Sequence, residues 1–458
     1  MTHSDFNTII LAAGNGTRMN SSIPKTLHEI CGASMLSLIL ASSSEAGSKK
    51  NYVIVPENHQ EFLSHTTTNS ILVTQKEANG TGDAVLKAEK HIKENLPLVV
   101  INGDTPLIES ETLKNLIQSH TTSHATITIT TCNINQPENF GRIIRDQKGK
   151  VHKIVEESNL TKSQKSINEI NCGIYCFDLN WIWNSLKNIK TSSTNELFLT
   201  DLIEMAYKQN KKVESISPQK EYEITGVNTL IDLSKAEKHL RQKINYSLMS
   251  NGVKITDPDS TYIDINVTIG QDTIIKPNSH IYGNSSIGEN CIIGPTTQIY
   301  ASKIGHHTTI NSSLVKDSTI KNYVEIGPSS HIRDNSIVGD NARIGTNAEI
   351  KNTTVGSGTK SGHFCYLGDS KIGQNVNIGA GTITCNFDGQ NKHETIIGDD
   401  TFIGSDSLLI APINIGKKVI TGAGSVVNKD IPDNSKAIGF PVKILKSEFK
   451  NGSKFGNS

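Results

Sequence analysis

The chain has 458 residues, and this length favours two or three domains over one hydrophobic core. Lys+Arg and Asp+Glu balance at 45 each, so no overall positive field attracts nucleic acid or an anionic membrane. No apolar stretch approaches the roughly 20 residues of a membrane helix, and the first residues lack a secretory signal. We therefore expect a cytoplasmic protein that binds neither nucleic acid nor the membrane interior.

The cysteines exclude two further classes of protein. There are seven, an odd number, and they are scattered without the paired C-x-x-C spacing of a zinc site or the pattern of a disulfide framework. We predict reduced thiols that are mostly buried.

Short apolar runs alternate with helical patterns in the first half of the chain. The runs at 8–13, 51–55 and 97–101 are typical of strands buried on both faces of a mainly parallel sheet. Apolar residues recur at helical spacing over 81–92, and again over 110–117 behind Ser110, which we expect to cap that helix. The pattern predicts an α/β domain over residues 1–228.

A different pattern follows this domain. Residues 229–250 are charged and helical in period, which predicts a linker helix. Residues 251–445 then repeat an aliphatic residue every six positions. The repeat positions are Ile263, Ile269, Ile275, Ile281, Ile287, Ile293, Ile299, Ile326, Ile332, Val338, Ile344, Ile350, Ile372, Ile378, Ile397, Ile403, Leu409 and Ile415. The tail, 446–458, is expected to be disordered.

These hexads resemble the left-handed parallel β-helix family, in which three hexads form one triangular coil and the aliphatic residue points inward. One coil cannot bury its own apolar face, so coils must stack. An antiparallel sandwich, the alternative, would show a period of two. The period is interrupted at 351–371 and 379–396, where we expect extruded loops that carry binding or catalytic groups.

A glycine-rich turn follows the first predicted strand. Gly14 and Gly16 would let backbone N–H groups approach a phosphate, and Arg18 and Lys25 would neutralise its charge. The turn lacks the third glycine of a dinucleotide fingerprint and the Gly-Lys-Ser/Thr of a P-loop, and by itself it is equally compatible with a simple turn. Asp104 ends another predicted buried strand, where its carboxylate suits Mg²⁺, with a cap or turn role as the alternative.

The whole signature from Leu11 to Lys25 resembles the sugar-nucleotide pyrophosphorylases, and further motifs follow in that family's order up to Asn228. The resemblance implies an α/β, Rossmann-like nucleotidyltransferase that joins N-acetylglucosamine 1-phosphate to UTP and releases pyrophosphate, without a covalent nucleophile. It implies that Arg18 and Lys25 are catalytic and grip the triphosphate, and that Asp104 and Asn228 ligate Mg²⁺. The residues implied to bind UTP or UDP-N-acetylglucosamine are Leu11, Ala12, Ala13, Gly14, Lys25, Gln75, Gly80, Thr81, Asn102, Gly103, Asp104, Gly141, Glu156, Asn171 and Asn228.

Residues 360–369 and 375–386 resemble the acetyltransferase half of the bifunctional N-acetylglucosamine-1-phosphate uridyltransferase and glucosamine-1-phosphate acetyltransferase family. The resemblance implies that His363 is the general base for acetyl transfer, and a histidine side chain, with a usual pKa near 6.5, suits that task. It implies that glucosamine 1-phosphate binds to Arg333, Lys351, Tyr366 and Asn377, and acetyl-CoA to Ala380, Asn386, Phe387, Ser405 and Ala423.

Two residues depart from the family pattern. Phe387 replaces a tyrosine found in many members, and Phe440 replaces an arginine that would face the CoA phosphates. The family also implies a homotrimer and a product that feeds cell-envelope polysaccharides, in the synthesis of the peptidoglycan cell wall and of lipopolysaccharide. Two other functions stay open at this point: a pyrophosphorylase that makes ADP-glucose or GDP-mannose, and a non-catalytic sensor joined to a scaffold.

Overall fold

A computed structural model of the chain describes residues 5–14, 16–77, 79–189 and 196–445. By its internal contacts the chain divides into two units, Met1–Leu240 and Arg241–Ser458. The expected disordered tail, 446–458, lies outside the described residues. All seven cysteines are free thiols, and four of them are buried, as predicted.

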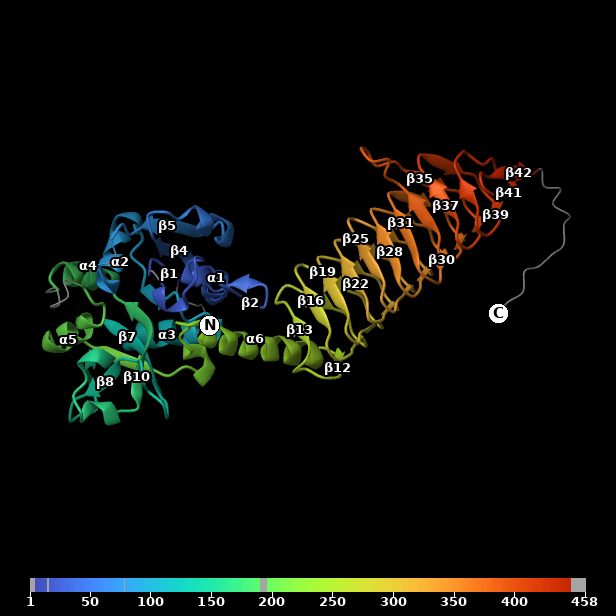
Figure 1. Ribbon diagram of the computed structural model, residues 1–458. Coiled ribbons are helices and arrows are strands. Elements are labelled where there is room, and N and C mark those ends of the chain that lie inside the picture. The colour runs from blue at the N-terminus through green and yellow to red at the C-terminus, as the bar shows by residue number, and fades with distance from the viewer. Residues whose placement is uncertain (1–4, 15, 78, 190–195, 446–458) are drawn as a thin grey trace. The chain divides into compact units, whose positions relative to one another are not determined.

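The N-terminal unit is built on one mixed sheet with the strand order β11-β7-β10-β6-β1-β4-β5 (Figure 1). Its strands are β1 (Phe6–Leu11), β4 (Ser48–Val55), β5 (Ser70–Thr74), β6 (Leu98–Asn102), β7 (Ile127–Asn133), β10 (Glu169–Phe177) and β11 (Val213–Ile216). A hairpin of β8 (Arg142–Arg145) and β9 (Val151–Val155) joins it through β10. Of the seven strands in this order, only β10 runs against its neighbours, so the sheet is mainly parallel as predicted.

Helices cover both faces of this sheet. They are α1 (Met35–Ala46), α2 (Thr81–Lys87), α3 (Ser110–Ser123), α4 (Leu179–Lys187) and α5 (Asp201–Lys208). Neighbouring residues of β1 face opposite sides: Ile10 packs with α1 and α3, and Ile9 packs with α2, α4 and α5. This double burial explains why the strands read as continuous apolar runs.

Two details of the predicted helices were wrong. Ser110 is the first helical residue of α3 rather than its cap; Glu109 occupies the cap position, without a side-chain hydrogen bond to the helix. The Glu109 carboxylate instead accepts a hydrogen bond from the Tyr222 hydroxyl at 2.5 Å. The helix predicted over 81–92 ends at Lys87 and continues as a short 3-10 turn, Glu89–His91.

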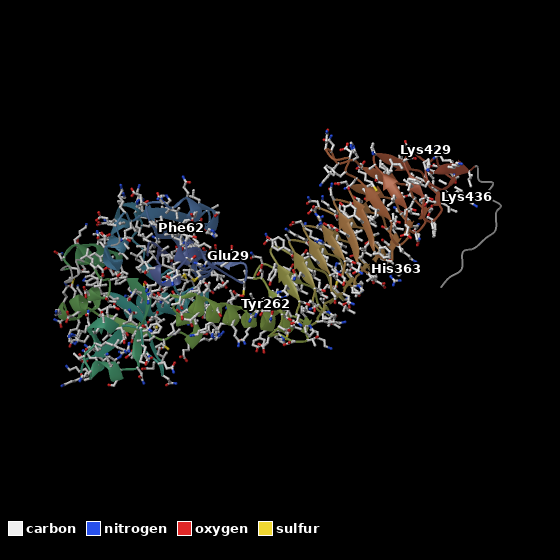
Figure 2. The ribbon with its side chains drawn as sticks, viewed as in Figure 1. Glu29, Phe62, Tyr262, His363, Lys429 and Lys436 are labelled. Atoms are coloured by element: carbon white, nitrogen blue, oxygen red, sulfur yellow. The ribbon has the colours of Figure 1, made fainter. Side chains whose placement is uncertain are left out.

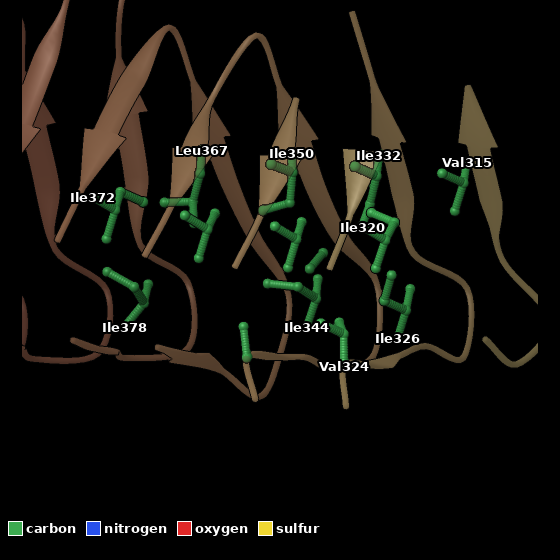
Figure 3. Close-up of a cluster of buried hydrophobic side chains, with 14 of the residues drawn as sticks. Val315, Ile320, Val324, Ile326, Ile332, Ile344, Ile350, Leu367, Ile372 and Ile378 are labelled. Carbon is green, nitrogen blue, oxygen red and sulfur yellow. The ribbon is translucent and has the colours of Figure 1, made fainter. Parts of the chain in front are cut away.

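The C-terminal unit is a parallel β-helix of short strands. Its three faces are sheets of parallel strands that begin with β12 (Lys254–Ile255), β13 (Tyr262–Ile263) and β14 (Thr268–Ile269). The last strand of the first sheet, β42 (Lys443–Leu445), is the exception and pairs antiparallel with β41 (Lys436–Ile438). Neighbouring coils place residues three hexads apart in register, such as Ile275 with Ile293 and Ile281 with Ile299. The repeat residues point inward and stack (Figure 3). All of them are buried except Ile269, which is half-buried, so the fold predicted from the hexads is confirmed.

The hexad period shifts between Ile299 and Ile326. There the inward positions are Ile304, Ile310, Val315 and Ile320, so several steps are shorter than a hexad. Ile287 pairs with Ile304, and Ile304 pairs with Ile320, so these coils are shorter than three full hexads. The stack continues through this region although the sequence period fails.

Of the two interruptions in the period, only the second is an extruded loop. Over 351–371 the coil continues through β29 (Thr354–Val355), β30 (Lys360–Ser361) and β31 (Cys365–Gly368), which contradicts the predicted loop. The repeat was missed for two reasons. The steps from Ile350 to Val355 and from Leu367 to Ile372 are five residues long, and the inward residue between them, Ser361, is polar, with its hydroxyl 2.8 Å from Cys365 Sγ. The second interruption does leave the stack: 386–394 forms a loop closed by a bridge between Phe387 and Lys392, before β35 (Thr395–Ile397).

A long helix, α6 (Leu230–Ser250), spans the boundary between the units. Near its end, Ile244, Leu248 and Met249 pack against the β-helix core. This end therefore caps an apolar stack that would otherwise meet solvent. In the described part of the chain, no helix is long and apolar enough to cross a membrane.

We expect removal of one inward side chain to weaken the β-helix strongly. Ile344 is fully buried, so Ile344→Ala should cost about 3 kcal/mol from lost burial and the cavity left behind. Ile337 belongs to the preceding strand, β26 (Ile337–Val338), and its side chain is 40% exposed, so Ile337→Ala is the matched control. Urea unfolding followed by circular dichroism should show a lower midpoint for Ile344→Ala alone, and equal midpoints for the two variants would contradict the packing.

The N-terminal unit should lose stability on mild acidification because of His120. Burial lowers the pKa of this imidazole to about 4, and its Nδ1 lies 3.1 Å from Thr128 Oγ1. In the unfolded chain a histidine has a pKa near 6.5, so between pH 6.5 and 4 the unfolded state binds more protons and stability falls as the pH falls. From pH 7 to pH 5 the loss should be about 2 kcal/mol.

Both tryptophans of the chain, Trp181 and Trp183, lie on α4, so their fluorescence reports on this unit alone. Urea unfolding at pH 7 and pH 5 measures the effect. His120→Gln should be less stable at pH 7 but should lose most of this pH dependence. If the free energy of unfolding of His120→Gln fell as much between pH 7 and pH 5 as that of the wild type, the acid sensitivity would belong to other groups.

Candidate active sites

A cavity of about 360 Å³ opens at the carboxyl ends of β1 and β6. Ligands of open α/β sheets usually bind at this position, because the loops that leave neighbouring parallel strands meet at this edge of the sheet. Its lining consists of Leu11, Ala12, Ala13, Gly14, Lys25, Thr26, Gln75, Gly80, Thr81, Ala84, Asn102, Gly103, Asp104, Glu196 and Phe198. Eleven of these fifteen residues belong to the predicted nucleotide-binding set.

A second cavity, of about 290 Å³, adjoins the first and shares Thr81, Asn102, Asp104 and Phe198 with it. The remaining predicted residues of this unit line it: Arg18, Gly141, Glu156, Asn171 and Asn228. Folding therefore brings together all the predicted site residues of the N-terminal unit, from segments as distant in the sequence as those of Arg18 and Asn228.

Two glycines permit the close approaches that build the first cavity. Gly16 has a left-handed backbone, and a Cβ there would lie 2.7 Å from Lys25 Cβ. A Cβ on Gly103 would lie 2.5 Å from the Leu11 carbonyl oxygen, which accepts the Gly103 N–H at 3.0 Å. Side chains at these positions would push Lys25 and the ends of β1 and β6 apart.

Polar side chains converge where the two cavities meet. Lys25 Nζ lies 2.8 Å from Asp104 Oδ2 and 2.8 Å from Asn228 Oδ1, and Arg18 Nη2 donates to the same Asn228 oxygen at 2.7 Å. Asp104 lies in a turn, two residues after the end of β6. Its backbone carbonyl accepts a hydrogen bond from the Val227 N–H at 2.8 Å. The predicted metal ligands and the predicted phosphate-binding cations thus form one cluster.

The second cavity has its own polar groups at the far side. Asn171 is held by two hydrogen bonds: its Nδ2 donates to Tyr175 Oη at 2.7 Å, and its Oδ1 accepts the Gly173 N–H at 3.2 Å. Burial raises the pKa of Glu156, against the effect of the Thr200 hydroxyl, which donates to Glu156 Oε1 at 3.1 Å. These fixed amide and carboxyl groups can hydrogen-bond a polyhydroxylated ligand.

Sequence reasoning missed a segment that lines both cavities. Phe198 contributes to each of them, and Leu199 and Thr200 contribute to the second. The segment is anchored by hydrogen bonds, including Leu197 N–H to the Asn79 carbonyl at 2.9 Å and Leu199 N–H to Thr81 Oγ1 at 3.0 Å. It lies between elements and carries no glycine-rich or charged motif, so nothing in its sequence marks it.

Four predicted residues of the C-terminal unit lie along one edge of the β-helix. His363 stands at the corner between β30 and β31, and Ala380, Ser405 and Ala423 stand at the same corner on the three following coils. Backbone hydrogen bonds connect the corners, from Gly381 N–H to Phe364 O at 2.7 Å and from Gly424 N–H to Ser405 O at 2.8 Å. His363 is exposed on the outer surface (Figure 2).

The other predicted residues lie on the faces next to this edge. Arg333 of β25 (His331–Arg333) is directly opposite Lys351 of β28 (Ala348–Lys351), and Tyr366 follows on the next coil of the same face. Arg333 donates to Glu349 Oε1 at 2.7 Å, which fixes its guanidinium. Asn377 belongs to β33 (Asn377–Ile378), on the face that meets the His363 corner from the other side.

The extruded loop begins beside these residues. Asn386 donates to Asp369 through its amide, and its Nδ2 lies 3.5 Å from Tyr366 Oη. Phe387 is 60% exposed and Phe440 is 80% exposed, so neither is a core residue. His363 and the loop lie at opposite edges of the face that contains β25, β28 and β31: His363 where the chain enters it, before β31, and the loop where the chain leaves it, between β34 (Ile383–Cys385) and β35. Arg333 and Lys351 end their strands on the loop side.

Comparison with known proteins agrees with this division. A nucleotidyl transferase family model matches residues 7–239. A bacterial transferase hexapeptide model matches residues 266–301 and 317–352, and a hexapeptide repeat model of succinyl-transferase matches residues 394–429. The fold and the sites define a nucleotidyltransferase followed by a hexapeptide-repeat acyltransferase.

Curated relatives named "Bifunctional protein GlmU" match nearly the whole chain. The relative from Carboxydothermus hydrogenoformans is 38% identical over 96% of this chain and 99% of its own length. That from Thermosipho africanus is 41% identical over 98% of both chains, and that from Lactococcus lactis is 43% identical over 96% of both. The chain belongs to the GlmU family of bifunctional proteins.

The chain is accordingly a bifunctional enzyme of UDP-N-acetylglucosamine synthesis. Its hexapeptide unit is the acetyltransferase that acts on glucosamine 1-phosphate, and its nucleotidyl transferase unit is the uridyltransferase that acts on N-acetylglucosamine 1-phosphate. Membership of this family excludes the two functions left open by the sequence motifs, a different nucleotide sugar and a non-catalytic scaffold.

Proposed function

We propose that the two adjoining cavities of the N-terminal unit hold the nucleotide and the sugar of one substrate pair. The segment 11–14 with Gln75, Gly80 and Thr81 binds the uracil and ribose, with Asn102 and Gly103 completing that wall. Gly141, Glu156 and Asn171 bind the N-acetylglucosamine. The observation that carries this assignment is that every one of these residues lines one of two cavities that share four residues.

The cations between the cavities are the catalytic groups of this reaction. Lys25 and Arg18 meet at Asn228, where the α-phosphate of UTP must pass from pyrophosphate to the sugar phosphate. Their charges stabilise the phosphoryl oxygens as negative charge shifts to the leaving pyrophosphate, and the attacking sugar phosphate is held in line by its own site. No covalent nucleophile is required.

The oxygens of Asp104 and Asn228 fit a Mg²⁺ ion. Both lie 2.8 Å from the same ammonium nitrogen, so they converge on one cationic position, and one carboxylate with one amide is a donor set that Mg²⁺ accepts alongside substrate phosphates. When bound, Mg²⁺ would neutralise the phosphate charge.

In the C-terminal unit, we propose that Arg333 and Lys351 bind the phosphate of glucosamine 1-phosphate, with Tyr366 and Asn377 on the sugar. The His363 imidazole removes a proton from the sugar amine as its nitrogen attacks the thioester carbonyl, and CoA leaves as the thiol. Acetyl-CoA lies along the edge formed by Ala380, Ser405 and Ala423. The alignment of the edge residues on successive coils supports this path. Asn386 and Phe387, at the opposite edge of the same face, are assigned to this ligand by the family resemblance alone.

We also propose that the chain acts in the cytoplasm as a homotrimer and supplies cell-wall polysaccharide synthesis. Apolar side chains are exposed on the last coils, including Ile383 (40%), Phe402 (48%) and Ile410 (43%). Such side chains on flat strand faces suit contact with a second copy of the chain. Sedimentation equilibrium measures the assembly, and a monomer at micromolar concentration would contradict it.

A single incubation tests the proposed chemistry. Purified protein is mixed with glucosamine 1-phosphate, acetyl-CoA, UTP and Mg²⁺, and free CoA, pyrophosphate and UDP-N-acetylglucosamine are measured by mass spectrometry. All three products are expected. Omission of Mg²⁺ should abolish pyrophosphate while free CoA still forms, and pyrophosphate release at full rate without a divalent ion would contradict the metal assignment.

A further inference from the structure

A third cavity, of about 430 Å³, lies in the N-terminal unit apart from the two substrate cavities and shares no lining residue with them. One wall is the turn of the β8–β9 hairpin, and the other is the connection from α5 to β11. Its lining is rich in cationic side chains: Arg145, Lys148, Lys150, Lys211 and Lys212. Neither proposed reaction uses any of these residues.

The charges of this cavity are not balanced by its own carboxylates. Arg145 is paired with Glu169, with N···O 2.6 Å, and Lys212 with Glu214 at 3.1 Å. Lys148, Lys150 and Lys211 are exposed, and within the described residues none of their ammonium groups lies within 4.0 Å of a carboxylate. Lys150 also interacts electrostatically with Asp146 at longer range, so Lys148 and Lys211 are the two lysines whose charge is most available for a ligand in the cavity.

The backbone that carries these lysines is held in place on both walls. In the hairpin turn, Asp146 Oδ1 accepts the N–H groups of Lys148 and Lys150, each at 2.9 Å. The Tyr207 hydroxyl of α5 donates to Asp146 Oδ2 at 3.0 Å, which ties the two walls together. On the second wall, the Lys211 N–H donates to the Ala206 carbonyl at 2.9 Å. A binding site whose backbone is already ordered costs less entropy when a ligand arrives.

We propose that this cavity binds a small polyphosphate anion, of which inorganic pyrophosphate is the simplest example. Lysine ammonium groups bind phosphate as point charges, and they project here from opposite walls, as a ligand with charge at both ends requires. Asn210 and Ser215 also line the cavity and offer an amide and a hydroxyl to phosphate oxygens. Pyrophosphate is a product of the uridylyl transfer, so the site would meet this anion during turnover.

Tryptophan fluorescence can report on binding at this cavity. Trp181 Nε1 donates to Gln209 Oε1 at 2.9 Å, and Gln209 immediately precedes the lining residues Asn210 and Lys211. Trp183→Phe leaves Trp181 as the single reporter. A second substitution, Lys25→Ala, weakens pyrophosphate binding in the active site, and Mg²⁺ is omitted for the same purpose. The full-length chain with Trp183→Phe and Lys25→Ala is the parent for the titrations.

Titration of the parent with inorganic pyrophosphate should give a saturable signal with one site per chain, and the affinity should fall as NaCl is raised. Lys148→Ala with Lys211→Ala should weaken binding at least tenfold. The matched control is Lys50→Ala with Lys93→Ala, two exposed lysines outside the cavity, and it should bind as the parent does. Unaltered binding in the first pair, equal weakening in the control pair, or no saturation would each overturn the proposal.

Discussion

His363→Ala should lower kcat for acetyl transfer by about 10²- to 10⁴-fold, the usual contribution of a general base. The exposed imidazole stands at an edge of the β-helix and packs into no core, so its loss should leave the fold and the uridylyl transfer unchanged. Release of CoA, followed with a thiol reagent, measures the first activity, and pyrophosphate release with supplied N-acetylglucosamine 1-phosphate measures the second.

A matched control for this variant is available on an earlier coil. His306 is likewise exposed at a corner of the β-helix, and His306→Ala should keep full acetyltransferase activity. If His363→Ala retained more than about a tenth of the wild-type rate, the general base would have to be another group. Loss of both activities would contradict two independent sites.

Asp104→Ala should have the opposite effect and abolish uridylyl transfer. The carboxylate holds the Lys25 ammonium at 2.8 Å and is one of two oxygens suited to Mg²⁺, so its removal withdraws a metal ligand and frees a catalytic cation at once. Metal charge stabilisation contributes several kcal/mol, so we expect a loss of about 10³-fold or more in kcat/KM. Acetyl transfer by the same sample is the internal control.

A second substitution separates charge from packing at this position. Asp104→Asn keeps the size of the side chain and an oxygen but removes the negative charge. It should also lose most of the uridylyl transfer, and raised Mg²⁺ should restore part of it by mass action. An active Asp104→Asn enzyme with unchanged Mg²⁺ dependence would show that Asp104 only positions Lys25.

The β-helix was predictable because one physical rule determines both its sequence and its structure. An inward position in every hexad puts each aliphatic side chain above the one three hexads away, as in the pairs Ile275 with Ile293 and Ile281 with Ile299. The rule fails where coils are shorter. The shortened coils between Ile287 and Ile320 keep the stack but break the spacing, and only backbone pairing reveals them.

Polar inward residues limited the prediction in another way. Ser361 is buried and forms a hydrogen bond with Cys365 Sγ, so one inward position of its coil, between the aliphatic Val355 and Leu367, carries no aliphatic residue. A hydroxyl is tolerated there because the interior supplies its partner.

In the N-terminal unit, a glycine-rich turn and charged residues after strands indicated Gly14, Arg18, Lys25 and Asp104, and the other predicted residues of the two cavities came from the family resemblance. These residues lie together because the carboxyl ends of parallel strands share one edge of the sheet. Phe198 and Thr200 could not be found this way. They enter the cavities from a connecting segment whose position depends on hydrogen bonds to distant backbone groups, such as that from Leu197 to Asn79.

The row of corners from His363 to Ala423 also acts as a molecular ruler. Neighbouring parallel strands are about 4.8 Å apart, so three coil steps fix a rise of about 14 Å that no side chain can alter. The length available to an extended ligand along this edge is therefore counted in whole coils. Evolution or design could lengthen this edge only by inserting a complete coil, so the length of ligand that it accommodates changes in steps of one coil.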